Sequence, residues 1–354
     1  MKIVLWGAVG LLGLILLYFL LVMLVAGIVF ALLYGRVDHT YSRRALFSDF
    51  PEIKVERQYI RRRRKRLAVY LIGEETEKGL VIISHGIRDR GEGYFTEARA
   101  FLARGYRVLL YDAVGSGNSS GRSQRGLPQS AIDLHDVLTW AERSPHFSGL
   151  NFYLYGHSWG GYAVCAVFQL GAHPRVKAVC SLSGFNDPCR MMLESGSVLS
   201  DHLGRFVYPP MCLLQFLRFG RAMFRTAEKG ILAAKCRFLI LHAEEDQAIK
   251  AEGAGIYAKR EKLASERVQF RLIHGRHHLN GWLEEKCCEA NARLDSAYHA
   301  IVGKYGFRMS KKQERAFYSP IGREERIALS VPDENYFNKI DEFYMEGENP
   351  YDRV

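Results

Sequence analysis

A pentapeptide near the middle of the chain has the pattern of an activated serine. Residues 156–160 are Gly-His-Ser-Trp-Gly, which fits the motif Gly-x-Ser-x-Gly. The apolar stretch 151–155 precedes it and the small-residue stretch 161–170 follows, so we predict a strand, a tight turn and a helix. Such a turn requires small flanking residues and projects the hydroxyl group from the edge of a sheet. Ser158 is therefore the candidate nucleophile for acyl transfer.

A serine nucleophile needs a base that is held in place by an acid. In proteins with this strand-turn-helix motif, the chain order is serine, then acid, then histidine. Three histidines come directly after the last predicted strand, 268–273, where a loop can reach Ser158: His274, His277 and His278. Spacing from Gly275 favours His278 as the base, with His277 as the alternative. His242 closes an earlier strand and is interpreted as structural.

The acid is expected at the end of the preceding strand, 237–242. The next carboxylates are Glu244, Glu245 and Asp246, and Asp246 is our choice, with the other two in an exposed turn. Asp112 also ends a predicted strand, but it precedes Ser158 in the chain. We interpret Asp112 as a brace for the glycine-rich turn 115–118, which lacks the phosphate-binding pattern Gly-x-x-x-x-Gly-Lys-Ser/Thr.

Acyl transfer also requires hydrogen-bond donors for the oxyanion that develops on the attacked carbonyl. The backbone N–H of Trp159, the residue after the nucleophile, is one expected donor. The second is expected in the loop after the strand 80–84, and the Ile87 N–H is our choice. His85 in the same loop is interpreted as a side chain that braces the loop.

Short apolar runs alternate with helical stretches through the middle of the chain, which predicts an α/β fold with a mostly parallel sheet. Predicted helices at 93–104, 129–143, 161–170 and 251–263 separate the predicted strands, which are 55–60, 67–72, 80–84, 107–111, 151–155, 176–182, 237–242 and 268–273. Residues 186–231 contain no convincing strand and are rich in methionine and phenylalanine. We predict that they form a helical cap.

The N-terminal segment carries no charge from Ile3 to Tyr34. A membrane span needs ~20 apolar residues, and the apolar part of a signal peptide has only ~7–15. We therefore predict a transmembrane anchor at 1–35, a juxtamembrane linker at 36–54, a hydrolytic domain at 55–308 and a polar surface tail at 309–354. The positive residues that follow the span, such as Arg36 and Arg43, place the domain in the cytoplasm by the positive-inside rule.

Charge and cysteine content narrow the possible partners. The formal net charge is +11, and the basic run Arg61–Arg66 lies close after the anchor without any nucleic-acid-binding motif around it. We therefore expect a membrane surface, and no nucleic acid, as the partner of this run. None of the seven cysteines has metal-ligand spacing, so the cysteines predict no metal site.

Taken together, these motifs resemble the α/β-hydrolase superfamily, and within it the group of monoacylglycerol lipases and serine aminopeptidase-like proteins. The resemblance covers about residues 55–305 and lies in His85-Gly86, Tyr111-Asp112, 156–160, Asp246 and His278. Two positions depart from the pattern of these relatives. Ala113-Val114 stand where an arginine–glycine pair is common, and Ala243 stands where a glycine is usual.

The resemblance implies hydrolysis through an acyl-enzyme, without a metal or organic cofactor. For the substrate we favour a small-molecule or lipid carboxylic ester, because the apolar cap suits an acyl chain and the anchor keeps the site near lipid. A peptidase that acts on N-terminal residues is the alternative, and it would need carboxylates such as Glu194 or Asp201 to bind the substrate amine. A non-catalytic membrane protein that retains the fold is the alternative from another class.

Overall fold

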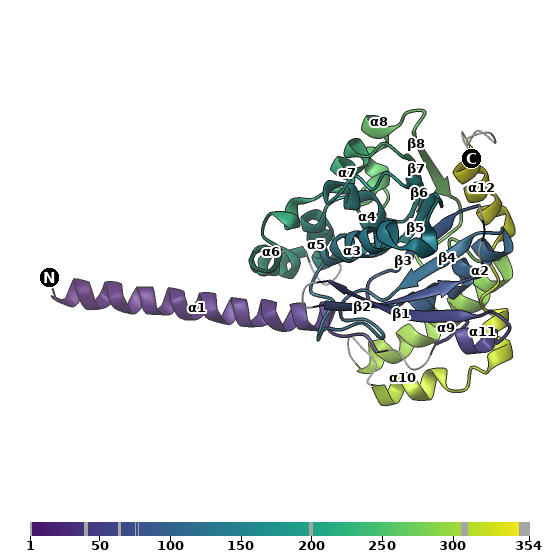
Figure 1. The fold of residues 1–354 in the computed structure, drawn as a ribbon. Helices are drawn as coiled ribbons and strands as arrows, with labels where there is room; N and C mark the ends of the chain where they lie inside the picture. The colour runs from purple at the N-terminus through teal and green to yellow at the C-terminus, as the bar shows by residue number, and fades with distance from the viewer. Residues whose placement is uncertain are drawn as a thin grey trace.

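One eight-stranded sheet forms the centre of the computed structural model, which describes residues 2–38, 42–62, 65–74, 76, 78–197, 201–305 and 311–346. The strand order is β1-β2-β4-β3-β5-β6-β7-β8 (Figure 1). Strand β2 is antiparallel to both of its neighbours, and all pairs from β4 to β8 are parallel. The bounds are β1 Val55–Arg62, β2 Lys65–Ile72, β3 Leu80–Ser84, β4 Arg107–Tyr111, β5 Phe152–His157, β6 Val176–Leu182, β7 Arg237–Ala243 and β8 Val268–Ile273.

Helices cover both faces of the sheet, which confirms the predicted α/β-hydrolase architecture. Helices α3, α4 and α7 pack in the core of one face, and α2, α9 and α12 pack in the core of the other. The central strands are buried on both sides, as their continuous apolar sequences require. The helices are α1 Lys2–Tyr34, α2 Phe95–Ala103, α3 Gln129–Arg143, α4 Trp159–Ala166, α5 Pro188–Ser197, α6 Asp201–Phe219, α7 Ala227–Ala233, α8 Arg260–Leu263, α9 Glu285–Tyr305, α10 Lys311–Tyr318, α11 Arg323–Ala328 and α12 Glu334–Met345.

Helix α1 projects far out of the domain as one continuous helix (Figure 1). Its segment Val9–Tyr34 is long and apolar enough to cross a membrane. The C-terminal end of α1 is part of the domain, because Ala26, Phe30 and Tyr34 are buried in the core. The chain then continues along the loop after β4 through a backbone bridge between Gly35 and Ser123.

The segment between β6 and β7 is helical, in agreement with the predicted cap. It contains α5, α6, a 3-10 turn at Gly220–Phe224 and α7. Gln215 of the cap accepts the N–H of Leu127, and the carbonyl oxygen of Leu127 accepts the indole N–H of Trp159, so a single residue connects the cap to the turn that carries Ser158. The serine turn and the loops after β3, β7 and β8 all follow the carboxyl ends of parallel strands, where sites form in such sheets.

The helix predicted at 251–263 was wrong over most of its length. The structure has turns there, followed by the 3-10 turn Ile256–Lys259 and the short helix α8. The physical reason is pairing with the loop after β6. The N–H of Ile256 donates to the carbonyl oxygen of Gly184, and the carbonyl oxygen of Ala254 accepts the N–H of Asn186, so these groups are not available for the hydrogen bonds of a helix.

The predicted polar surface tail at 309–354 was also wrong over residues 334–345. Helix α12 buries Phe337, Ile340 and Tyr344 against the sheet. The Phe337 ring packs edge-on against the Phe101 ring of α2, with a centroid distance of 5.3 Å. The predicted linker 36–54 is likewise part of the fold, because Ala45 and Phe50 are buried in the same cluster as α12.

Candidate active site

The pentapeptide 156–160 forms the turn between β5 and α4. Ser158 has φ +58° and ψ −115°, a conformation that non-glycine residues rarely adopt. The flanking glycines allow the turn to close. A Cβ atom on Gly160 would lie 1.9 Å from the carbonyl oxygen of Ser84, and one on Gly156 would lie 2.3 Å from that of Gly160. Close packing of this kind holds Ser158 in its strained conformation.

Three side chains from separate loops meet at this turn. The Oγ atom of Ser158 lies 2.9 Å from Nε2 of His278, and Nδ1 of His278 lies 2.7 Å from Oδ2 of Asp246. The other carboxylate oxygen of Asp246 accepts hydrogen bonds from the N–H groups of Ala248 and Ile249. The carboxylate is thus fixed, and it orients the imidazole so that Nε2 can take the serine proton.

The environment keeps Asp246 ionised. Burial alone would raise the pKa of this carboxyl group. The hydrogen bond from His278 and the N–H of Ile249 outweigh burial and hold the pKa below its ordinary value. An ionised carboxylate next to the ring stabilises the imidazolium that forms when His278 takes a proton.

The other histidines of this region make different contacts, and only His242 among them also lies near Asp246, with its Nε2 atom 3.7 Å from Oδ2. The side chain of His277, the alternative base, is 56% exposed and pairs with Glu245. His274 is exposed and pairs with Glu244. The ring of His242 is buried, and its Nε2 bonds to the carbonyl oxygen of Ile249, which supports the structural role expected for it.

Asp112 braces the loop that follows β4. Its carboxylate accepts hydrogen bonds from the N–H groups of Gly91 and Asn118 and from the hydroxyl of Tyr70. Gly117, with φ +44°, passes so close that a Cβ there would lie 2.3 Å from this carboxylate. Among the residues that the structure describes, no group of three or more histidine, cysteine or carboxylate side chains could hold a metal ion.

His85 fixes the peptide that carries the second expected oxyanion donor. Its Nε2 accepts the N–H of Ala113, so its Nδ1 carries the proton and donates to the carbonyl oxygen of Gly86. In a trans peptide the C=O and N–H point in opposite directions, so this bond also sets the direction of the Ile87 N–H. Within the described ranges, neither this N–H nor that of Trp159 has a backbone acceptor.

Two buried residues that the sequence analysis missed connect the oxyanion loop to the histidine loop. Nε2 of His157 donates to the carbonyl oxygen of His278, and Nδ1 accepts from the hydroxyl of Tyr94. That hydroxyl also accepts the N–H of Gly86. Burial, together with the nearby His278, holds the pKa of His157 well below its ordinary value, so the ring is neutral and can both donate and accept. His157 is a variable position of the motif Gly-x-Ser-x-Gly and Tyr94 lies outside it, so the motif carried no signal for either residue.

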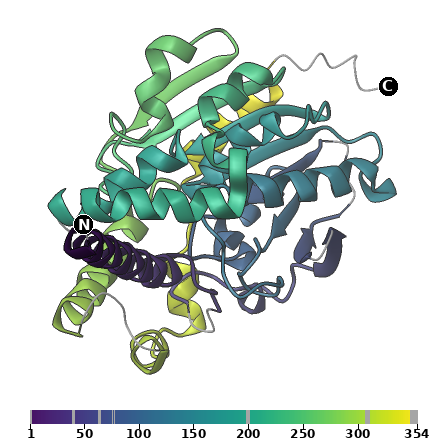
Figure 2. The same ribbon diagram turned by 90° about the vertical axis from the view of Figure 1, so that its left-hand side faces the viewer.

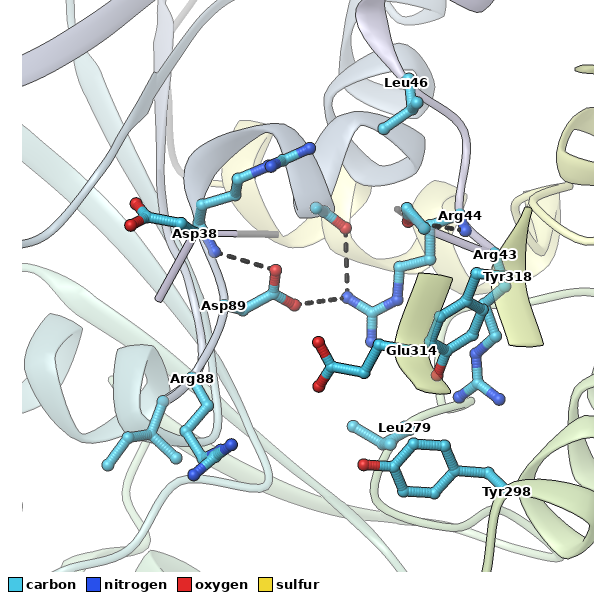
Figure 3. A pocket seen from close by; sticks show the side chains of 14 residues that line it. Asp38, Arg43, Arg44, Leu46, Arg88, Asp89, Leu279, Tyr298, Glu314 and Tyr318 are labelled. Carbon is cyan, nitrogen blue, oxygen red and sulfur yellow. Dashed lines mark hydrogen bonds and ion pairs between the residues drawn. The ribbon is translucent and has the colours of Figure 1, made fainter. Parts of the chain in front are cut away.

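A pocket of about 370 Å³ adjoins these loops (Figure 3). Ile87 of the oxyanion loop and Leu279, the neighbour of His278, line one side. Charged side chains from the segment 38–46, from the loop after β3 and from α10 line the rest, and tyrosines from α9 and α10 lie among them. These residues are Asp38, Arg43, Arg44, Arg88, Asp89, Arg90, Tyr298, Glu314 and Tyr318.

Arg44 joins the juxtamembrane segment to this site. Its guanidinium group pairs with Asp89 at 2.8 Å, an interaction drawn in Figure 3. The same group lies 5.7 and 5.6 Å from the ring centroids of Tyr94 and Trp282, within cation-π range. The predicted linker therefore forms one wall of the pocket beside the candidate catalytic residues.

A model of the X-Pro dipeptidyl-peptidase family, S15, matches residues 38–279. This range covers more than half of the chain and includes Ser158, Asp246 and His278. The chain belongs to the S15 family. Membership of the S15 family makes it a hydrolase of the α/β type, as the resemblance implied. No curated protein sequence matches the chain.

Solved structures support the same architecture for this S15 member. An esterase from Pyrococcus furiosus, in three crystal forms, resembles the chain with TM-scores of 0.50 to 0.53. The sequences are 15–16% identical, and the similarity covers 76–77% of this chain and 95–98% of that esterase. At this identity the likeness concerns the fold, and it confirms the α/β-hydrolase fold.

Proposed function

We propose that this protein is a membrane-anchored serine hydrolase that cleaves a carboxylic ester through an acyl-enzyme. The hydrogen-bonded series Ser158–His278–Asp246 carries the proposal. Ser158 attacks the ester carbonyl while His278 takes its proton, and the N–H groups of Ile87 and Trp159 stabilise the oxyanion. His278 then gives the proton to the leaving alcohol. Water, activated by the same histidine, releases the acid and restores the serine.

The surroundings of the site support an ester that has an acyl chain and a polar alcohol. The pocket beside Ile87 and Leu279 is lined by charged groups, which suits a polar leaving group. The cap contributes Met192 and Met211 to the apolar cluster that also contains Trp159, and methionine side chains adapt to apolar chains of different shape. Glu194, which a peptidase would need for a substrate amine, already binds two backbone N–H groups.

Packing of α1 supports a retained anchor over a cleaved signal sequence. Phe30 and Tyr34 are buried in the core, and the carbonyl of Tyr34 accepts the N–H of Gln124 at 2.7 Å. Cleavage after the apolar segment would remove these side chains and expose the surface that they cover. We therefore place the hydrolase domain against the membrane that α1 crosses. The positive residues that follow α1 in the sequence favour the cytoplasmic side of that membrane.

An active-site probe tests the proposal directly. The full-length protein in detergent should be labelled covalently by a fluorophosphonate, and Ser158→Ala should abolish the labelling. Ser116→Ala is a matched control, because Ser116 is also fully buried but lies in the glycine-rich turn. Labelling that persists in Ser158→Ala, or turnover of a p-nitrophenyl acyl ester that survives this change, would refute the assigned nucleophile.

Peptide hydrolysis is the second candidate, and the match to the X-Pro dipeptidyl-peptidase family favours it. The same nucleophile and base serve both reactions, so the substrate must decide. Parallel assays should compare a monoacylglycerol with a dipeptide p-nitroanilide that has proline in its second position. We expect turnover of the ester. Turnover of the anilide alone, abolished by Ser158→Ala, would assign the protein as a peptidase.

A further inference from the structure

Helix α6 of the cap has apolar side chains on two opposite faces. Met211 is buried, and Leu214 packs against the core of the domain. Leu213, Phe216 and Leu217 are 37%, 45% and 69% exposed. The i, i+3 and i+4 spacing of these three residues places them on one side of the helix. A cap helix that only covers a site needs one apolar face. We therefore expect the second, exposed apolar face of α6 to contact a partner.

Helix α6 lies beside the helix that we propose as the anchor. Figures 1 and 2 both show α6 alongside the end of α1 that meets the domain, and the two helices are in contact. The guanidinium group of Arg218 on α6 lies 4.0 Å from the ring centroid of Phe30 on α1. The position of α1 in a bilayer therefore sets the position of α6.

The exposed apolar surface of α1 brings the bilayer to α6. A helix of 33 residues is about 50 Å long at 1.5 Å per residue, whereas the hydrocarbon core of a bilayer is ~30 Å thick. The apolar surface nevertheless continues to the docked end, where Leu24, Ile28 and Leu32 are 60%, 53% and 60% exposed. Water around these side chains would be unfavourable, so this end of α1 and the neighbouring α6 belong at the boundary between hydrocarbon and headgroups.

Charge around the exposed face of α6 fits the same boundary. From Tyr208 to Ala227 the sequence has no acidic residue, whereas it has Arg218, Arg221 and Arg225. Phe224 extends the apolar surface at 53% exposure, with its ring centroid 6.2 Å from that of Phe216. Apolar and aromatic side chains edged by arginines are typical of helices that lie in the interface of anionic membranes.

We infer that the exposed face of α6, formed by Leu213, Phe216, Leu217 and Phe224, inserts into the interfacial region of the membrane crossed by α1. Its partner is a lipid monolayer, with anionic headgroups that pair with the arginines beside the face. The inference rests on the proposed anchoring by α1. It adds a second membrane contact, on the cap itself, which holds the cap in the lipid phase where an acyl ester resides.

Fluorescence quenching tests the insertion on the full-length protein in liposomes. The liposomes contain phosphatidylcholine and phosphatidylglycerol with acyl chains brominated near the headgroup. Leu217→Trp is compared with Leu232→Trp, because Leu232 is similarly exposed, at 58%, but lies on α7. The unsubstituted protein gives the background of its native tryptophans. We expect the added emission of Leu217→Trp to be quenched and blue-shifted, and that of Leu232→Trp to be neither.

Two further measurements separate the inference from the proposals on which it depends. Retention in the membrane pellet after alkaline carbonate reports on the anchor, and turnover of a water-soluble ester reports on the hydrolase. Leu217→Glu should leave both unchanged while it lowers hydrolysis of an ester embedded in vesicles by about tenfold, and Leu232→Glu should not lower it. Equal quenching at positions 217 and 232 in a protein retained by the pellet would overturn the inference.

Discussion

One histidine of an adjacent pair is placed for proton transfer. His278→Ala should lower ester turnover by several orders of magnitude, about as much as Ser158→Ala, because members of a proton-transfer unit do not act additively. His277→Ala should retain near-normal turnover, since His277 is mostly exposed and bonds to Glu245. Steady-state kinetics of the purified variants measures both effects. The opposite pair of phenotypes would assign the base to His277.

Tyr94 is a positioning residue, because its hydroxyl joins the oxyanion loop to the histidine loop through His157. Tyr94→Phe leaves Gly86 and His157 each without one buried hydrogen-bond partner, so we expect kcat to fall about tenfold with little change in KM. Tyr155→Phe is the matched control, since its hydroxyl is also buried but bonds to Tyr336. Equal losses of kcat in the two variants would point to general destabilisation instead.

At the scale of elements, α2 contains a carboxyl group that resists ionisation. Both carboxylate oxygens of Glu97 are buried and have no hydrogen-bond partner among the described residues. Burial raises the pKa of Glu97 to about 8, although Arg44 opposes the shift. In the unfolded chain Glu97 loses its proton at about pH 4.3, whereas in the folded protein it keeps the proton up to about pH 8. Its contribution to the free energy of unfolding is therefore complete below about pH 4.3 and is lost as the pH rises through about 8.

Glu97→Gln should remove this pH dependence. We expect the variant to have a higher Tm than the parent protein at pH 8–9 and a similar Tm at pH 5, in thermal unfolding of the full-length protein in detergent. Glu289→Gln provides the control, because Glu289 is exposed. If the Tm of Glu97→Gln falls between pH 5 and 9 as steeply as the Tm of the parent protein, the prediction is wrong.

Helix α12 contributes one apolar face to the core. Phe337→Ala should lower the free energy of unfolding by about 3–5 kcal/mol, because it leaves a cavity next to Phe101 and Tyr155. Lys339→Ala on the exposed side of the same helix should change stability little. Denaturant titrations of both variants measure the difference. Equal stability of the two would mean that α12 does not pack on the domain in solution.

On the scale of the whole molecule, orientation follows from the charges on either side of α1. Lys2 precedes the span, whereas Arg36, Arg43 and Arg44 follow it, so the domain is expected in the cytoplasm. A green fluorescent protein fused to the C-terminus should fluoresce, and an alkaline phosphatase fused there should stay inactive. An active phosphatase fusion would reverse the topology and would move the proposed lipid substrate to the outer leaflet.

The basic run Arg61–Arg66 has less unpaired positive charge for a membrane surface than its composition indicates. Arg62 pairs with Asp136 and Lys65 pairs with Asp133, so part of its charge is compensated within the domain. Arg63 and Arg64 lie outside the described residues. We still propose that the run faces the anionic membrane surface, and replacement of Arg61–Arg64 by serine is the direct test of that contact.

Much of the site could be predicted from the sequence because its parts depend on local order. The turn that holds Ser158 needs small residues at fixed positions, and these are visible in the sequence of 156–160. Parallel strands end at one edge of the sheet, so residues that follow them, such as Asp246 and His278, can be placed near the serine from chain order alone. The apolar run of α1 likewise needs no tertiary contact to be recognised.

Only the tertiary structure decided which distant segments complete the site. Arg44 pairs with Asp89, and Tyr94 reaches His157. Neither contact has a periodic or motif signal, because each joins segments whose meeting depends on the packing of the whole chain. Helix α12 differs, because Tyr336, Phe337, Ile340, Phe343 and Tyr344 have the spacing of one helical face, and the tertiary structure decided only where that face packs. The double apolar character of α6 is decided in the same way, since packing alone determines which of its two apolar faces is buried and which is exposed.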